Sequence, residues 1–124
     1  MVQCGIDIIE VERIKDIIEK NGDRFLNDVY SQREIDYCNS KNSTKYLHFA
    51  ARFAAKEAVY KAASNMLDNK YDLVWKDMEI LNDENGRPYV IINKEKIDRD
   101  LKIDLSISHI KEYAIANCVI YEGE

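Results

Sequence analysis

The run from Arg52 to Ala62 (RFAAKEAVYKA) places charged side chains among small apolar ones. Residues three or four apart share one face of an α-helix, so Arg52 should lie beside Lys56, and Glu57 beside Lys61. The alanines would let this helix pack closely against another element. Basic groups next to a carboxylate suit an anionic, phosphorylated ligand that is held together with a hard metal ion. The run therefore indicates phosphoryl chemistry.

Asp7 is the second candidate, because it interrupts an apolar strand pattern over Val2–Ile9. A carboxylate there is costly unless it is paired, hydrogen-bonded or bound to a metal. One interpretation is a salt bridge with Arg13 or Lys56. The other combines Asp7 with Glu57: one carboxylate from a strand and one from a helix, together with phosphate oxygens and water, would complete an octahedral Mg²⁺ site.

Other positions have two interpretations each. His109 ends an alternating strand, where it could donate to a phosphate or ribose or act in acid–base chemistry, or could simply be hydrogen-bonded. Lys61 could bind phosphate or pair with Glu57 on the helix surface. The turn at residues 86–88 could be an ordinary hairpin turn or could reach a neighbouring ligand. His48 is expected to be structural or exposed.

Apolar periodicity predicts the elements that must position these groups. Ser31 and Glu34 form a capping-box pattern, and Thr44 is a candidate cap for the long helix. Helices come early and strands late, which predicts one α+β domain over residues 1–124 with an antiparallel sheet. The predicted helices are Glu10–Asn21, Arg24–Tyr30, a helix from the capping box to about Asn39, and one from Thr44 through Ala63; the predicted strands are Val2–Ile9, Val74–Leu81, Pro88–Asn93, Leu101–Ile110 and Tyr113–Tyr121. Asn65–Leu73 is ambiguous, and Lys94–Arg99 is either a short helix or a loop.

Composition excludes several classes of protein. The net charge of −5 argues against a nucleic-acid binder, and no apolar stretch is long enough for a membrane span. The N-terminus has no secretory pattern, so we expect a cytoplasmic protein. Three well-separated cysteines argue against a disulfide framework or structural zinc, and predict buried, reduced thiols.

Three blocks in this order form a recognisable pattern: Gly5-Ile6-Asp7-Ile8 followed by Arg13, the run from Arg52 to Ala62, and Leu105-Ser106-Ile107-Ser108-His109. They closely resemble the short, single-domain branch of the 4′-phosphopantetheinyl transferases, the holo-[acyl-carrier-protein] synthase type. The segments Asp77–Ile80 and Asn85–Val90 fit the central strands of the same family. The resemblance extends over essentially the whole chain.

The resemblance implies an enzyme that moves the phosphopantetheine arm of coenzyme A onto a serine of apo acyl carrier protein, releasing adenosine 3′,5′-bisphosphate in fatty acid biosynthesis. It implies an α+β fold and a homotrimer with active sites between subunits. Carried over by position, the resemblance implies that the Mg²⁺ ligands are Asp7 and Glu57, that Lys61 lies at the phosphates, and that Lys56 is an orienting group at the ligand. The nucleotide part of coenzyme A is expected at Arg52 and His109, with its adenine or ribose approached by Gly86, Arg87 and Pro88 of an adjacent subunit. The expected docking patch for the carrier is Arg13 and Arg24.

Two departures from the family pattern bear on these expectations. Asp28 stands where the family usually has a basic residue, which weakens the docking patch, and the stretch Asn65–Trp75 lacks the usual glycines. Two other functions stay open from the residues alone. One is a non-catalytic module that binds coenzyme A or an acidic partner, and the other is a metal-dependent phosphodiesterase.

Overall fold

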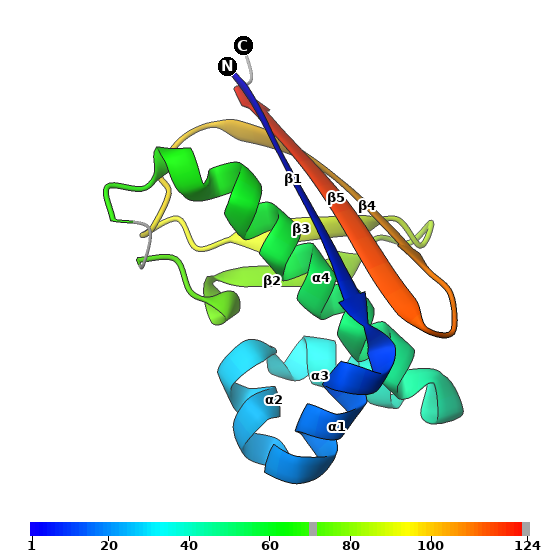
Figure 1. Ribbon diagram of the computed structural model, residues 1–124. Coiled ribbons are helices and arrows are strands. Elements are labelled where there is room, and N and C mark those ends of the chain that lie inside the picture. Colours follow the sequence, from blue (N-terminus) through cyan, green and yellow to red (C-terminus); the bar gives the residue numbers. More distant parts are fainter. Residues whose placement is uncertain (70–71, 123–124) are drawn as a thin grey trace.

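A long helix lies against a three-stranded antiparallel sheet, and shorter helices gather at one end of it (Figure 1). The computed structural model describes residues 1–69 and 72–122. The strands are β1 (Val2–Glu10), β2 (Met78–Asn82), β3 (Pro88–Ile92), β4 (Leu101–His109) and β5 (Tyr113–Glu122). The α-helices are α1 (Val11–Asn21), α2 (Asp23–Val29), α3 (Gln32–Asn39) and α4 (Lys45–Ala63), with 3₁₀ turns η1 (Asn42–Thr44), η2 (Ser64–Met66) and η3 (Trp75–Asp77).

Both sheets are antiparallel, so the predicted α+β class is confirmed. One sheet has the order β1-β5-β4, and β2 pairs with β3 in a separate hairpin. The helix α4 packs on β1 and β5 and also contacts β2. A core cluster lies where α4 meets the strands, and a second lies where α1, α2 and α3 meet the first half of α4.

The close approach of β1 to α4 depends on Gly5. A Cβ atom at this position would lie within 3.0 Å of the Ala58 carbonyl oxygen, the Ala62 nitrogen and Lys61 Cβ. Alternate residues of a strand face the same way, so Asp7 lies on the same face of β1 as Gly5 and is directed toward α4. The strand therefore carries its carboxylate to the helix at a spacing that only glycine permits.

The opposite face of β1 is apolar and open to solvent in the isolated chain. Ile6 is 58% exposed and Ile8 is 61% exposed, and Cys4 on the same face is also exposed. The prediction of buried thiols is therefore wrong for Cys4. It is confirmed for Cys38 and Cys118, whose thiol pKa values burial raises to about 12.

The predicted elements are confirmed with local exceptions. The Ser31 capping box forms: Glu34 N–H donates to Ser31 Oγ at 3.3 Å, and Ser31 N–H donates to Glu34 Oε1 at 2.8 Å. Thr44 makes no side-chain cap, because its hydroxyl instead donates to the Lys41 carbonyl at 3.0 Å.

The strand predicted to start at Val74 starts only at Met78. Asp77 Oδ2 accepts the Val74 N–H at 3.0 Å, and this closes the 3₁₀ turn η3 ahead of β2. Lys94–Arg99 contains turns and no helix. Of the ambiguous segment Asn65–Leu73, residues 70 and 71 lie outside the described residues.

Candidate active site

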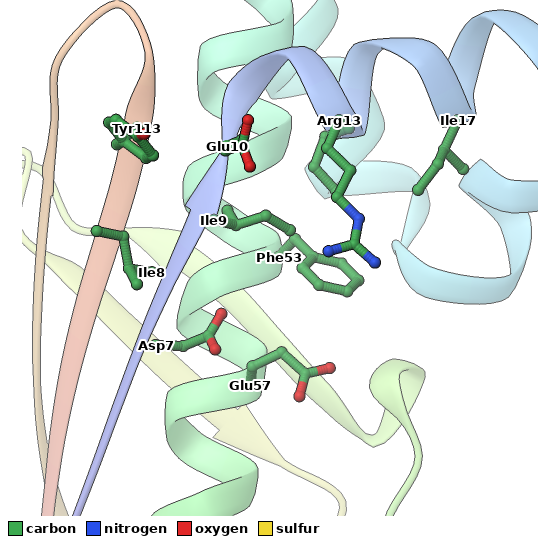
Figure 2. Close-up of a pocket in the computed structure, with 10 residues that line it drawn as sticks. Asp7, Ile8, Ile9, Glu10, Arg13, Ile17, Phe53, Glu57 and Tyr113 are labelled. Carbon is green, nitrogen blue, oxygen red and sulfur yellow. The ribbon is translucent and has the colours of Figure 1, made fainter.

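Asp7 and Glu57 line one pocket of about 420 Å³ between β1, α1 and α4. Figure 2 shows the two carboxylates near each other, with the Phe53 ring and the Arg13 guanidinium further along the pocket. The pocket is also lined by Ile14, Ile17 and Tyr113. The strand and the helix thus bring together the two carboxylates that the sequence analysis paired.

Each carboxylate has a partner that the sequence analysis did not assign to it. Lys61 Nζ donates to Asp7 Oδ1 at 3.2 Å and to the Ile6 carbonyl at 3.0 Å, so the partner of Asp7 is neither Arg13 nor Lys56. Glu57 Oε1 accepts the indole N–H of Trp75 at 2.7 Å. Lys61 therefore reaches across to the strand and does not form the helical pair with Glu57.

The donor set of this pocket fits Mg²⁺. Mg²⁺ prefers oxygen ligands and is commonly held by one or two carboxylates, with water and substrate phosphates completing the octahedron. Within residues 1–69 and 72–122, no group of three or more His, Cys, Asp and Glu side chains could hold a metal. Asp7 and Glu57 could supply two of the ligand positions, and the others would have to come from a phosphorylated ligand and water.

Arg52 belongs to a second pocket, of about 600 Å³, that also involves Tyr37, Asn82 and Gly86. Its side chain is nearly buried: the guanidinium lies 4.0 Å over the Tyr37 ring and donates to Asn82 Oδ1 at 2.5 Å. Asn82 Nδ2 in turn donates to the Gly86 carbonyl at 3.0 Å, and Gly86 has a φ of +82°, which suits glycine. Arg52 Nε is buried, and it has no hydrogen-bond partner among the residues that the structure describes.

Among the described residues, none lines both pockets. Successive residues of a helix point about 100° apart, so Phe53 faces the carboxylate pocket while Arg52 faces the other one. His109 lies in neither set; it is exposed at the end of β4, with its ring centroid 5.7 Å from that of His48. Burial, and then the nearby His109, lower the pKa of His48 below its ordinary value.

Lys56 lies in the core, which contradicts its expected position at the ligand. Its ammonium is fully buried and pairs with Glu34 Oε1 at 2.7 Å. It also donates to the carbonyls of Val29 at 2.7 Å and Trp75 at 3.1 Å. Burial lowers the pKa of Lys56, while Glu34 opposes that shift. Through its three oxygen partners, this lysine on α4 is joined to α2, α3 and η3.

The expected docking residues lie on the helical end of the molecule. Arg13 lines the carboxylate pocket. Arg24 lines a smaller pocket of about 260 Å³ with Asn21, Phe25 and Asp28. Asp28, the acidic residue that departs from the family pattern, thus lines the same pocket as Arg24.

The comparisons with known proteins identify the family. A model of the 4′-phosphopantetheinyl transferase superfamily matches residues 3–118. The chain belongs to this superfamily. Among the superfamily members that it resembles, the holo-[acyl-carrier-protein] synthase of Halothermothrix orenii is 44% identical over 124 residues, covering 96% of each chain. The synthase of Protochlamydia amoebophila is 46% identical over 117 residues, covering 93% of each chain.

Solved structures of superfamily members share the fold. The holo-(acyl-carrier-protein) synthase of Bacillus anthracis, in complex with CoA (3′,5′-ADP), has a TM-score of 0.80 and 33% identity, covering 98% of this chain and 96% of its own. The Helicobacter pylori synthase in complex with coenzyme A has a TM-score of 0.81 and 30% identity, covering 95% and 99%. Among the described residues, no helix is long and apolar enough to cross a membrane.

Four contacts to candidate site residues escaped the sequence analysis. Glu34, Tyr37, Trp75 and Asn82 all contact a candidate site residue from a distant part of the chain. Only Trp75 carried a signal, because it is the single tryptophan of the chain and stands next to a polar segment. The other three are ordinary residue types for a helix or a strand end.

Proposed function

We propose that this chain transfers the 4′-phosphopantetheine group of coenzyme A to a serine of apo acyl carrier protein. The observation that carries the proposal is the pair of carboxylates, Asp7 and Glu57, that face one pocket beside Lys61. Full-length similarity to holo-[acyl-carrier-protein] synthases, and to synthase structures in complex with coenzyme A, supports it. Anion binding alone would not require two carboxylates at the ligand, which favours catalysis over a simple binding module.

In the proposed reaction the serine oxygen attacks the phosphorus that bears the pantetheine arm. The new P–O bond forms as the bond to the nucleotide's phosphate oxygen breaks, and adenosine 3′,5′-bisphosphate leaves with that electron pair. A Mg²⁺ ion held by Asp7 and Glu57 would neutralise charge on the pyrophosphate oxygens. Lys61 would stabilise the same charge, and the serine proton would pass to a water that is held either by the cation or by Glu57.

We propose that the nucleotide part of coenzyme A binds at Arg52, His109 and the turn of Gly86, Arg87 and Pro88. The position of Arg52 on the lining of the second pocket supports a phosphate contact there. Positioning of this remote part would contribute much of the rate, as is typical of phosphoryl transfer.

We further propose a homotrimer with the active sites between copies. In one chain the carboxylate pocket and the Arg52 pocket are separate, so a neighbouring copy would supply the second half of each site. The exposed apolar face of β1 and β5, which includes Ile6, Ile8 and Ile115, supports such packing. The cytoplasm is the proposed compartment, since a reducing environment keeps thiols such as these three free.

Intact-mass spectrometry of an apo acyl carrier protein, incubated with this protein, coenzyme A and Mg²⁺, tests the function. We expect the carrier to gain one phosphopantetheine, and to gain none in EDTA or with Asp7→Asn or Glu57→Gln variants that circular dichroism shows to be folded. Coenzyme A that binds without being consumed, across a panel of carriers, would instead identify a binding module. Cleavage of coenzyme A without a carrier would identify a phosphodiesterase.

A further inference from the structure

Trp75 contacts Glu57 directly, although it lies on a different element. It stands in the turn η3, and its indole Nε1–H donates to Glu57 Oε1 at 2.7 Å. We propose that Trp75 is a positioning residue that fixes one oxygen of this carboxylate, so that the other is presented to the divalent cation. This inference rests on the proposed function, because it assigns a role within the same metal site.

Two contacts orient Trp75, one at its backbone and one at its ring. The Trp75 carbonyl accepts from buried Lys56 at 3.1 Å, and Lys56 is fixed by its ion pair with Glu34. The ring packs on Phe53 with centroids 5.8 Å apart. Trp75 is 39% exposed, but its backbone is held by Lys56 and its ring rests on Phe53, and these two contacts direct the indole N–H to Glu57.

Fixing the Glu57 side chain would favour cation binding at a site where Asp7 and Glu57 are the two proposed protein ligands. A glutamate on a helix surface samples several rotamers, and a cation that requires one of them must first overcome this freedom. A hydrogen bond from a neutral donor to a carboxylate is charge-assisted, and it restricts the rotamer without neutralising the ligand. Partners of this kind typically change metal affinity or activity 10–100-fold when they are removed.

Replacing Trp75 with β-(3-benzothienyl)alanine isolates the N–H donor, because sulfur replaces the N–H while the bicyclic shape stays. We would measure Mg²⁺ affinity by calorimetry with saturating coenzyme A and no carrier. We expect at least about tenfold weaker Mg²⁺ binding in this variant and in Trp75→Phe. Val74→Ala is the matched control, since it changes the neighbouring exposed side chain and keeps the indole; its Mg²⁺ affinity should equal that of the wild type.

The indole resonance gives a readout independent of metal and turnover. Trp75 is the only tryptophan, so a ¹H–¹⁵N correlation spectrum contains one indole signal. We expect this signal to move upfield in metal-free Glu57→Gln, because a carboxylate acceptor is replaced by an amide, and to move much less in Asp7→Asn. An indole N–H chemical shift that is unchanged in Glu57→Gln would overturn the inference.

The outcomes separate this inference from the proposed function. If the wild type binds Mg²⁺ and transfers phosphopantetheine, but the sulfur analogue binds Mg²⁺ within twofold of the wild type, only the role of Trp75 fails. If the wild type binds no Mg²⁺ even with coenzyme A, the metal assignment of Asp7 and Glu57 fails, and the positioning role fails with it.

Discussion

Lys61 and a divalent cation would share the same carboxylate. Lys61 Nζ is 3.2 Å from Asp7 Oδ1 and donates to the Ile6 carbonyl at 3.0 Å. Both partners are partly solvated, so the pair itself contributes little to stability. Under the proposed function, the contact would place an ammonium group beside the phosphates while it orders Asp7 for the metal.

Lys61→Met separates these two roles. Because the variant removes a cation that competes for Asp7, we expect Mg²⁺ affinity in the presence of coenzyme A to stay the same or to rise. The transfer rate should fall about 10²–10³-fold, as when one charge-stabilising donor is lost from a reaction site. Calorimetry and intact-mass kinetics measure the two quantities. Mg²⁺ binding that weakens along with the rate would mean that Lys61 acts by organising the metal site.

The sequence allowed prediction of the carboxylates but not of their partners. Asp7 stood out because a charge interrupts an apolar strand, and Glu57 because it lies in a charged, alanine-rich helix. Whether Lys61 pairs with Glu57 or with Asp7 depends on how β1 lies across α4. That arrangement is a tertiary one, and periodicity along a single element contains no information about it.

At the scale of elements, α4 supplies charged groups to three different surroundings. Glu57 faces the carboxylate pocket, Arg52 faces the second pocket, and Lys56 faces the core. A lysine in the core is tolerated because Glu34 and two carbonyls satisfy it, and Glu34 Oε2 also accepts the Ile80 N–H at 2.8 Å. This pair therefore joins α3 and α4 to β2.

Lys56→Met should destabilise the fold strongly. The variant leaves Glu34 buried without its cation, and breaking a buried pair in this way costs about 3–5 kcal/mol. Urea denaturation followed by circular dichroism measures the free energy of unfolding. Removing both charges with Glu34→Gln and Lys56→Met should cost less than the sum of the two single variants. A single-variant loss below about 1 kcal/mol would show that water or rearrangement compensates Glu34.

Most element types were predictable, and the errors are local. The helices and strands have clear periodicity, as in Leu101–His109. Trp75 and Lys76 read as strand residues, but the Asp77 carboxylate closes a turn on Val74, and local side-chain bonding of this kind competes with strand formation. The same turn brings Trp75 to Glu57, so the mistaken strand also concealed the most informative contact of the site.

At the scale of the whole molecule, the described residues form separate carboxylate and Arg52 pockets, and an apolar face of β1 is open to solvent. Ile6→Glu tests whether that face joins copies, because a charge there should oppose apolar packing while leaving the pocket residues unchanged. We expect sedimentation equilibrium to give three copies for the wild type and one for the variant, with transfer activity lost in the monomer. A monomeric wild type with full activity would contradict the assembly.

Charge on the helical end should decide carrier affinity. We expect Arg13→Glu to weaken binding of an acidic carrier about tenfold or more at low salt, with coenzyme A affinity unchanged, because the substitution replaces attraction by repulsion. Asp28→Arg is the matched variant of opposite sign, and it should tighten binding. Surface plasmon resonance at two salt concentrations measures both. Unchanged carrier affinity in Arg13→Glu would remove this residue from the docking surface.

Gly5 has a consequence for how this chain can change over generations. It has no functional group, yet any side chain there would meet the backbone of α4 at Ala58 and Ala62. Larger residues would push the helix away from the strand and separate Glu57 from Asp7. A comprehensive mutational scan should therefore find position 5 about as intolerant as the carboxylates themselves, and lineages that diverge in partner and surface should keep this glycine as long as they keep the chemistry.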